Sequence, residues 1–128
     1  MDALLRRSDA GRALFITSGA ARSLPPYWAL YASTKAALEA IAMAYAKETQ
    51  NTNLRVNVVN PGPTRTDMRA AAFPGEDPSQ LPPPEHIAET MIRLAAPDYD
   101  GTGQWIAADA QTTATTATTA AAGDASVH

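Results

Sequence analysis

The chain has 128 residues, enough for one domain, with a formal net charge of −3 and no cysteine. A weakly acidic chain lacks the basic surface that binds nucleic acid or anionic membranes, so neither partner is expected. The lack of cysteine excludes disulfides, thiolate chemistry and cysteine-based zinc sites. No apolar run approaches the ~20 residues that a membrane helix needs, so we expect a soluble, cytoplasmic protein.

The first half of the chain predicts alternating helices and strands. Residues 1–9 are typical of the end of a helix. The apolar run within 12–17 is typical of a parallel strand that is covered on both faces. A long alanine-rich helix over 27–49 follows, and then a second strand over 54–59, which ends at a Pro-Gly-Pro sequence.

The second half predicts fewer elements. Residues 69–84 are rich in proline and are expected to form a loop, followed by a helix over about 84–96 and a short strand over 104–108. Beyond residue 111 the sequence is a Thr/Ala repeat, which predicts a folded domain over 1–111 and a disordered low-complexity tail over 112–128.

This alternation predicts an α/β fold with a parallel sheet and right-handed crossovers. Ligands in such sheets bind beyond the carboxyl ends of the strands. The helix over 27–49 has a wide apolar surface, which predicts a second packing partner, either another helix or another subunit of a homo-oligomer.

Three side chains suggest proton-transfer chemistry. Tyr31 and Lys35 are four residues apart in the long helix and therefore project from one face, and Ser18 lies 13 residues before the tyrosine. A cation beside a phenol favours the phenolate and lowers the pKa of the phenol from its ordinary value of about 10. A nearby hydroxyl can hydrogen-bond a substrate oxygen, so the three groups together suit a carbonyl/alcohol pair.

These residues resemble a known family when they are combined with the segment Asn60-Pro61-Gly62-Pro63-Thr64-Arg65-Thr66-Asp67-Met68. A serine, a Tyr-x-x-x-Lys pair and a later Pro-Gly-x-x-x-Thr turn, in this register, are similar to the C-terminal half of a short-chain dehydrogenase/reductase. Residues 64–78 look most like a YciK-type bacterial subgroup. The resemblance covers roughly residues 1–110.

The resemblance implies a partial Rossmann-type fold, that is, strands five to seven of a doubly wound parallel sheet with their crossover helices. It implies an NAD(P)-dependent oxidoreductase that interconverts a carbonyl and an alcohol by hydride transfer. Tyr31 would be the general acid/base, Lys35 would bind the nicotinamide ribose, and Ser18 would hold the oxygen of a small-molecule substrate. Tyr31, Lys35, Pro61, Gly62, Thr64 and Thr66 would contact NAD or NADP.

Nothing in the chain matches the glycine-rich nucleotide turn of that family. We therefore expect a truncated chain that is inactive alone. Two alternatives stay open at this point: a non-catalytic interaction module that pairs with a full-length paralogue, and a remnant that does not fold alone. The choice between NAD and NADP and the identity of the substrate are not determined by the sequence.

Other polar and aromatic residues receive weaker predictions. Arg65 and Arg69 could meet a phosphate or an acidic substrate, but a solvated surface is the favoured interpretation. Tyr27 and Trp28 could contact substrate or simply pack. His86 has no metal-ligand partner at a useful spacing and is interpreted as surface, His128 lies in the tail, and no metal site is expected.

Overall fold

A computed structural model describes residues 1–108 of the chain. The helices are α1 (Asp2–Arg7), α2 (Ala20–Ser23), α3 (Ala29–Glu48), α4 (Asp67–Ala72) and α5 (Ala88–Ala95), with short 3₁₀ helices at Pro78–Gln80 and Pro84–Ile87; the strands are β1 (Arg12–Ile16), β2 (Arg55–Asn60) and β3 (Trp105–Ala107). The predicted domain boundary at residue 111 and the Thr/Ala tail lie outside the described residues.

The strands form a parallel sheet in the order β1-β2-β3, which confirms the predicted α/β class. β1 pairs with β2 from Arg12 opposite Arg55 to Ile16 opposite Val59. β2 is the central strand, and its Val56–Val59 run is buried. A strand that is covered on both faces carries such a continuous run instead of an alternating pattern.

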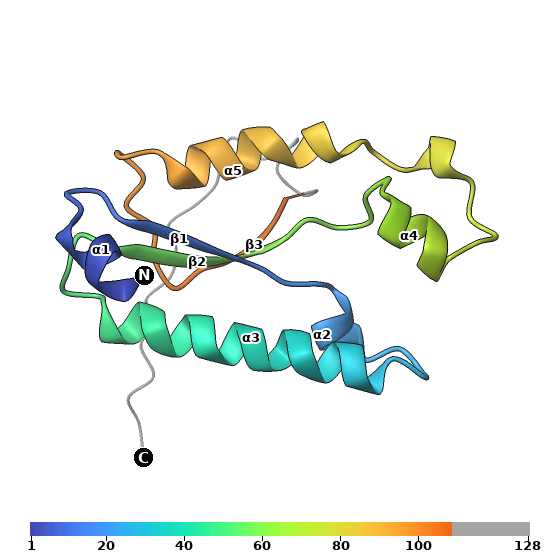
Figure 1. The fold of residues 1–128 in the computed structure, drawn as a ribbon, viewed down its shortest axis with the longest axis horizontal. Coiled ribbons are helices and arrows are strands. Elements are labelled where there is room, and N and C mark those ends of the chain that lie inside the picture. The colour runs from blue at the N-terminus through green and yellow to red at the C-terminus, as the bar shows by residue number, and fades with distance from the viewer. Residues whose placement is uncertain (109–128) are drawn as a thin grey trace, which may run out of the picture.

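Helices cover both faces of the sheet and give three layers, with α3 on one side and α5 on the other (Figure 1). On the α3 side, Ala46 packs with Leu54 and Val56. On the α5 side, Leu94 packs with Val59 and Ile106. Because successive side chains of a strand point to opposite faces, the valines of β2 serve both cores.

Asn57 is a polar residue inside this apolar strand, and its side chain is 1% exposed. Its Nδ2 donates to the carbonyl oxygen of Gly101 at 2.8 Å, and its Oδ1 accepts from the backbone N–H of Gln104 at 3.0 Å. A buried amide that has both a donor and an acceptor partner avoids the cost of an unsatisfied polar group. Asn57 therefore fixes the turn that leads into β3.

The inner face of α3 is made of small residues, because Ala32, Ala42 and Ala46 are the buried positions. Its outer face leaves Leu30 82% and Ile41 61% exposed. Although α3 is a 20-residue helix, none of the helices within residues 1–108 is long and apolar enough to cross a membrane.

The predicted loop over 69–84 was wrong in part, because α4 reaches into it and a 3₁₀ turn lies within it. The hydroxyl oxygen of Thr66 accepts the backbone N–H of Arg69 at 3.2 Å and caps α4, which then continues through three alanines. The predicted helix over 84–96 instead starts with a 3₁₀ turn before α5, and the long helix begins at Ala29, not at residue 27.

Candidate active site

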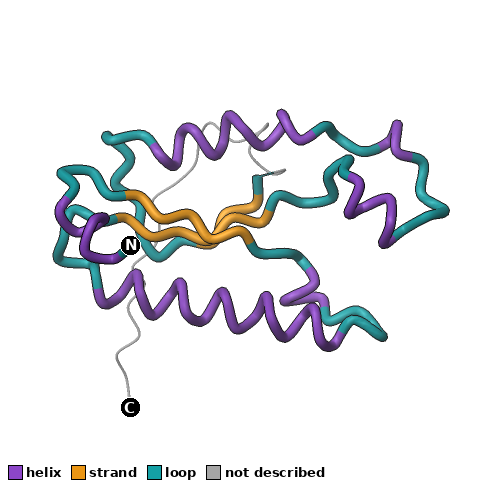
Figure 2. Tube along the Cα trace, in the orientation of Figure 1, coloured by secondary structure: helices purple, strands orange, loops and turns teal. Residues whose placement is uncertain are grey.

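The carboxyl ends of β1 and β2 lie at one edge of the sheet, where the chain leaves toward α2 and α4 (Figure 2). Beyond these ends lies a cavity of about 780 Å³. Its walls come from the segment after β1, the first turns of α3, and the segment from the end of β2 through α4. Since parallel α/β sheets bind ligands at this edge, the cavity is the candidate active site.

Every residue that the sequence singled out as catalytic or cofactor-binding lines this cavity: Ser18, Tyr31, Lys35, Pro61, Gly62, Thr64 and Thr66. The fold therefore brings together three stretches that are well separated in the sequence. Among residues 1–108 there is no group of three or more His, Cys, Asp or Glu side chains that could hold a metal ion.

Ser18 follows β1 and has a structural contact as well as a place in the cavity. Its Oγ accepts the backbone N–H of Ala20 at 3.2 Å at the start of α2, a short helix that the sequence did not predict. A hydroxyl that accepts one hydrogen bond still has its own hydrogen to donate. Ser18 can therefore hold a substrate oxygen while its position is fixed by the turn.

Tyr31 and Lys35 lie on one face of α3, as their spacing predicts, and both line the cavity. The Lys35 Nζ donates to the carbonyl oxygen of Ile16 at 3.0 Å and lies 5.9 Å from the centroid of the Tyr31 ring. An ammonium has three donors, so this bond leaves Lys35 able to bind further acceptors. The end of β1 thus orients the lysine toward the tyrosine.

The turn after β2 is shaped by Gly62, whose φ of 72° lies in the left-handed region that favours glycine. Its N–H donates to the Asn60 Oδ1 at 3.3 Å, and its carbonyl accepts from the Thr64 Oγ1 at 3.3 Å. The Thr66 hydroxyl caps α4. This residue therefore has a structural role that the sequence did not predict.

Most of the residues that form the aromatic and apolar wall of the cavity were not predicted from the sequence. Trp28, for which packing and substrate contact were both considered, lines the cavity and stacks on Phe73 with ring centroids 5.3 Å apart. Phe73 and Met68 were not predicted. Their presence in the cavity depends on the helix that starts at the Thr66 cap and on the way the chain leaves it at Phe73, and no local sequence pattern indicates this.

Arg69 was expected to be solvated surface, and it is only partly so. The side chain is 27% exposed, lines the cavity, and makes two 2.7 Å hydrogen bonds to the Glu76 carboxylate. Arg65 and His86 are exposed, and Tyr27 is fully exposed with a φ of 69°.

Glu39 lies behind the cavity, on α3, and its side chain is 15% exposed. It accepts hydrogen bonds from the Thr17 hydroxyl at 2.7 Å and from the Trp105 indole N–H at 3.0 Å. Arg22 pairs with it at 3.4 Å and also lies over the Trp105 ring. The residue just before Ser18 is thereby tied to α2, α3 and β3.

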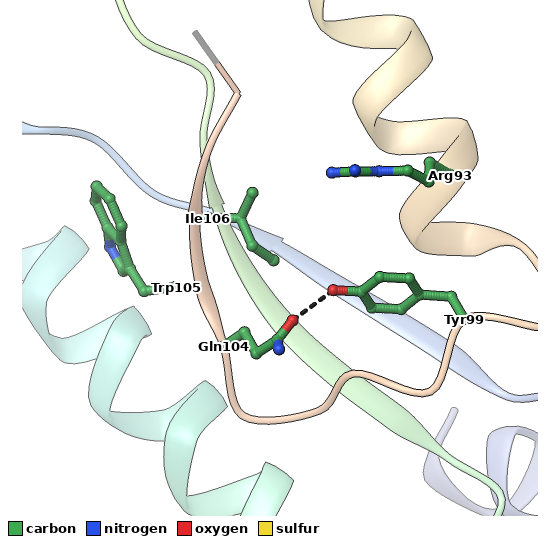
Figure 3. A pocket seen from close by; sticks show the side chains of 5 residues that line it. All are labelled: Arg93, Tyr99, Gln104, Trp105 and Ile106. Carbon is green, nitrogen blue, oxygen red and sulfur yellow. Dashed lines mark hydrogen bonds between the residues drawn. The ribbon is translucent and has the colours of Figure 1, made fainter. Parts of the chain in front are cut away.

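A second hollow of about 560 Å³ lies between β3 and α5 (Figure 3). Arg93 and Tyr99 reach toward Ile106 there, and the Tyr99 hydroxyl donates to the Gln104 side-chain oxygen. None of the predicted catalytic or cofactor-binding residues lines this hollow.

Comparison with solved structures gives the same fold. A short chain dehydrogenase from Salmonella enterica serovar Typhi is 43% identical with a TM-score of 0.80, over 83% of this chain and 44% of that one. A short chain dehydrogenase from Shigella flexneri, complexed with NADP, is 41% identical with a TM-score of 0.79, over 84% of this chain and 45% of that one.

Sequence relatives agree with the structural ones. The uncharacterized oxidoreductase YciK of Escherichia coli is 44% identical over 95 residues, which are 74% of this chain and 37% of YciK. This chain therefore spans less than half the length of these relatives. The family model described as short chain dehydrogenase matches residues 1–77, more than half of the chain. The chain thus belongs to the short-chain dehydrogenase family, and it is similar to the YciK-type members of that family.

Proposed function

We propose that the described residues form the proton-transfer and nicotinamide-binding part of an NADP(H)-dependent carbonyl/alcohol oxidoreductase. The observation that supports this most is the convergence of Ser18, Tyr31 and Lys35 with the Pro61-Gly62 turn around one cavity. NADP(H) is favoured because the Shigella flexneri relative is complexed with NADP. Since this chain spans less than half the length of its solved relatives, we expect it to bind the cofactor only weakly by itself.

In the proposed reaction, Tyr31 gives a proton to the substrate oxygen during reduction and removes it during oxidation. The Ser18 hydroxyl donates to the same oxygen and stabilises the charge that develops on it. Lys35 is a positioning cation, and its contact with the Ile16 carbonyl keeps its ammonium beside the Tyr31 ring. The bound cofactor would supply or accept the hydride.

The residues around the turn after β2 suit the nicotinamide end of the cofactor. A carboxamide needs both donors and acceptors. The Pro61 and Gly62 carbonyl oxygens can accept from its NH2 group, and the Thr64 hydroxyl can rotate away from the Gly62 carbonyl, to which it now donates at 3.3 Å, and donate to the carboxamide oxygen. The remaining donors of Lys35 suit ribose hydroxyls. Thr66, which already caps α4, is assigned to the edge of this subsite.

Saturation-transfer NMR with millimolar NADPH tests this proposal directly on the 128-residue chain. We expect the nicotinamide protons to receive more saturation than the adenine protons. The Lys35→Met variant should lose this pattern. Tyr45→Phe is the matched control, because that tyrosine lies on the same helix but bonds to Asp2 at 2.6 Å. Saturation mainly on adenine, or an unchanged pattern in Lys35→Met, would contradict the proposal.

We also propose that the chain pairs with a second copy through the outer face of α3. Leu30, Ala37, Ile41 and Ala44 are exposed there and recur at helical spacing. Light scattering should show a dimer or larger species that Ile41→Glu reduces to a monomer. Ile92→Glu on α5, which is 71% exposed, is the control that should leave the assembly intact. A monomeric wild type at high concentration would rule out this contact.

A further inference from the structure

One end of the active-site cavity is apolar. The side chains that form it are Pro25, Trp28, Met68, Ala72, Phe73 and Ile87. They come from the loop before α3, from α4, and from the end of the 3₁₀ turn before α5. An apolar wall with a few polar groups at one point is the usual form of a small-molecule site, in which the polar groups fix the orientation.

The aromatic part of this wall is continuous with the proposed general acid. Trp28 meets the Tyr31 ring edge to face, with centroids 5.6 Å apart and an angle of 85° between the planes. Its other contact is the Phe73 ring, at 5.3 Å and 30°. Trp28 and the edge of Phe73, whose two faces are covered by Trp28 and Arg69, therefore give an apolar surface beside the Tyr31 ring, and a flat apolar molecule can pack against it.

The charge at this end of the cavity is controlled by an ion pair. Two lining residues carry a positive charge, Lys35 beside Tyr31 and Arg69 at the apolar end. The Arg69 guanidinium lies 3.8 Å from the Phe73 ring centroid and is paired with both oxygens of Glu76. A bidentate pair uses the fork geometry with which an arginine would otherwise bind a substrate carboxylate.

We infer that this cavity accepts neutral carbonyl compounds with a flat apolar body packed against Trp28 and the edge of Phe73, and that Glu76 excludes carboxylate-bearing substrates by occupying Arg69. This inference rests on the proposed function, because it names the substrate class of the same site. A carboxylate that packs at the apolar end loses part of its hydration without gaining a cationic partner, and this desolvation is costly. Glu76 is thus a specificity-determining residue, although it does not line the cavity itself.

Calorimetric titration with a matched pair of ketones tests the inference. The first probe is 2-acetylnaphthalene, and the second is 6-acetyl-2-naphthoic acid, which adds only a carboxylate. We expect the wild-type chain to bind the neutral ketone at least about tenfold more tightly, which corresponds to about 1.4 kcal/mol. In Glu76→Gln the released Arg69 should bind the acid, so the ratio of the two dissociation constants should fall to about one or invert.

Three further variants separate the effect of releasing Arg69 from a change in net charge or a general loss of binding. Glu85→Gln removes one exposed negative charge close in sequence and should leave the ratio unchanged. Arg69→Met combined with Glu76→Gln should restore the preference for the neutral ketone. Phe73→Leu should weaken both probes by a similar factor, and it tests the aromatic wall even if Glu76→Gln does not fold.

Equal binding of the two ketones by the wild type, or an unchanged ratio in a folded Glu76→Gln variant, would overturn the inference. Because calorimetry needs neither cofactor nor turnover, its result is independent of the NADPH experiment. Selective ketone binding without nicotinamide contacts would leave the cavity as an apolar-ligand site and remove the proposed oxidoreductase role. Nicotinamide contacts without ketone selectivity would support the proposed oxidoreductase role and overturn the inferred substrate class.

Discussion

Two arginine–glutamate pairs flank the candidate active site, and they differ in what they connect. Arg69 and Glu76 form the better ion pair by geometry, with two hydrogen bonds of 2.7 Å. Arg22 and Glu39 approach only to 3.4 Å. The stronger pair nevertheless joins residues seven positions apart in one surface segment, whereas the weaker pair belongs to a network that spans the fold.

The Glu39 network joins four elements of structure. Thr17 follows β1, Arg22 lies on α2, Glu39 lies on α3 and Trp105 begins β3. Their hydrogen bonds meet at one carboxylate that is largely buried. We therefore expect that the number of separate elements joined by a charged side chain matters more to stability than the length of its shortest ion pair.

Both carboxylates have a depressed pKa, but for different reasons. Burial raises the pKa of Glu39, yet hydrogen bonds from Thr17 and Trp105 together with the nearby charge of Arg22 outweigh it, and the pKa falls below the ordinary glutamate value. The hydrogen bonds from Arg69 lower the pKa of Glu76. Each charged form is therefore favoured in the folded protein, and its contribution is lost as the pH falls through the depressed pKa.

The largest expected difference in stability is between variants that lack the Glu39 carboxylate and variants that lack the Glu76 carboxylate. Glu39→Ala leaves the Thr17 hydroxyl and the Trp105 indole N–H without their acceptor in a buried place, so we expect it to lower the free energy of unfolding by about 3 kcal/mol. Glu76→Ala should give no change that urea unfolding resolves, because its pair is solvent-screened and local. A similar loss for both variants would contradict the comparison.

A smaller change to the same network should give a smaller effect. Thr17→Val keeps the shape of the side chain but removes the 2.7 Å hydrogen bond to Glu39. We expect a loss of about 1.5 kcal/mol, which is typical of a hydrogen bond to a charged group. A double-mutant cycle with Glu39→Gln measures the coupling, and strict additivity would show that the two side chains act independently.

The sequence predicted the sheet well, and the residues that it proposed for the site line one cavity. The Val-rich run of β2 and the apolar run of β1 are local patterns, and parallel pairing follows once helices alternate with strands. Tyr31 and Lys35 were found from their spacing on one helix. The resemblance also placed Pro61 and Gly62 at the same edge of the sheet.

The tertiary contacts could not be predicted from the sequence. Trp105 and Glu39 are 66 residues apart and meet only because β3 packs beneath α3. The α4 segment was interpreted as a proline-rich loop, since a short helix there depends on one capping hydroxyl. The pairing of Arg69 with Glu76 requires the chain to turn back after α4, and no local sequence pattern indicates that turn.

The two tryptophans offer a pH test of the comparison, because Trp28 lies beside the Glu76 segment and Trp105 contacts Glu39. The stability that each charged form contributes is complete above the ordinary glutamate pKa of about 4.3 and is lost as the pH falls through the depressed pKa of the folded protein. In Trp105→Phe, the emission of Trp28 should change on acidification before the far-UV circular dichroism does. In Trp28→Phe, the emission of Trp105 should change together with it. If the emission of Trp28 and the circular dichroism of Trp105→Phe changed at the same pH, the part of the chain that carries Glu76 would unfold together with the core.

The smallest effect on the stability of the whole molecule is expected for the Thr66 cap, which acts on α4 alone. Thr66→Ala removes the acceptor of the Arg69 N–H and should destabilise α4 by about 1 kcal/mol. The exchange rates of the Ala70 and Phe73 amide hydrogens, whose acceptors lie in α4 or at its cap, should then rise about fivefold when measured on a short timescale.

Thr34→Ala is the control for this measurement. Thr34 is an exposed residue of α3 whose hydroxyl bonds to a backbone carbonyl, and its replacement should leave the exchange rates in α4 unchanged. Faster exchange that spread to the buried amides of β2 would show that α4 is coupled to the sheet, and the segment that carries Arg69 and Phe73 could not then open independently of the network around Glu39.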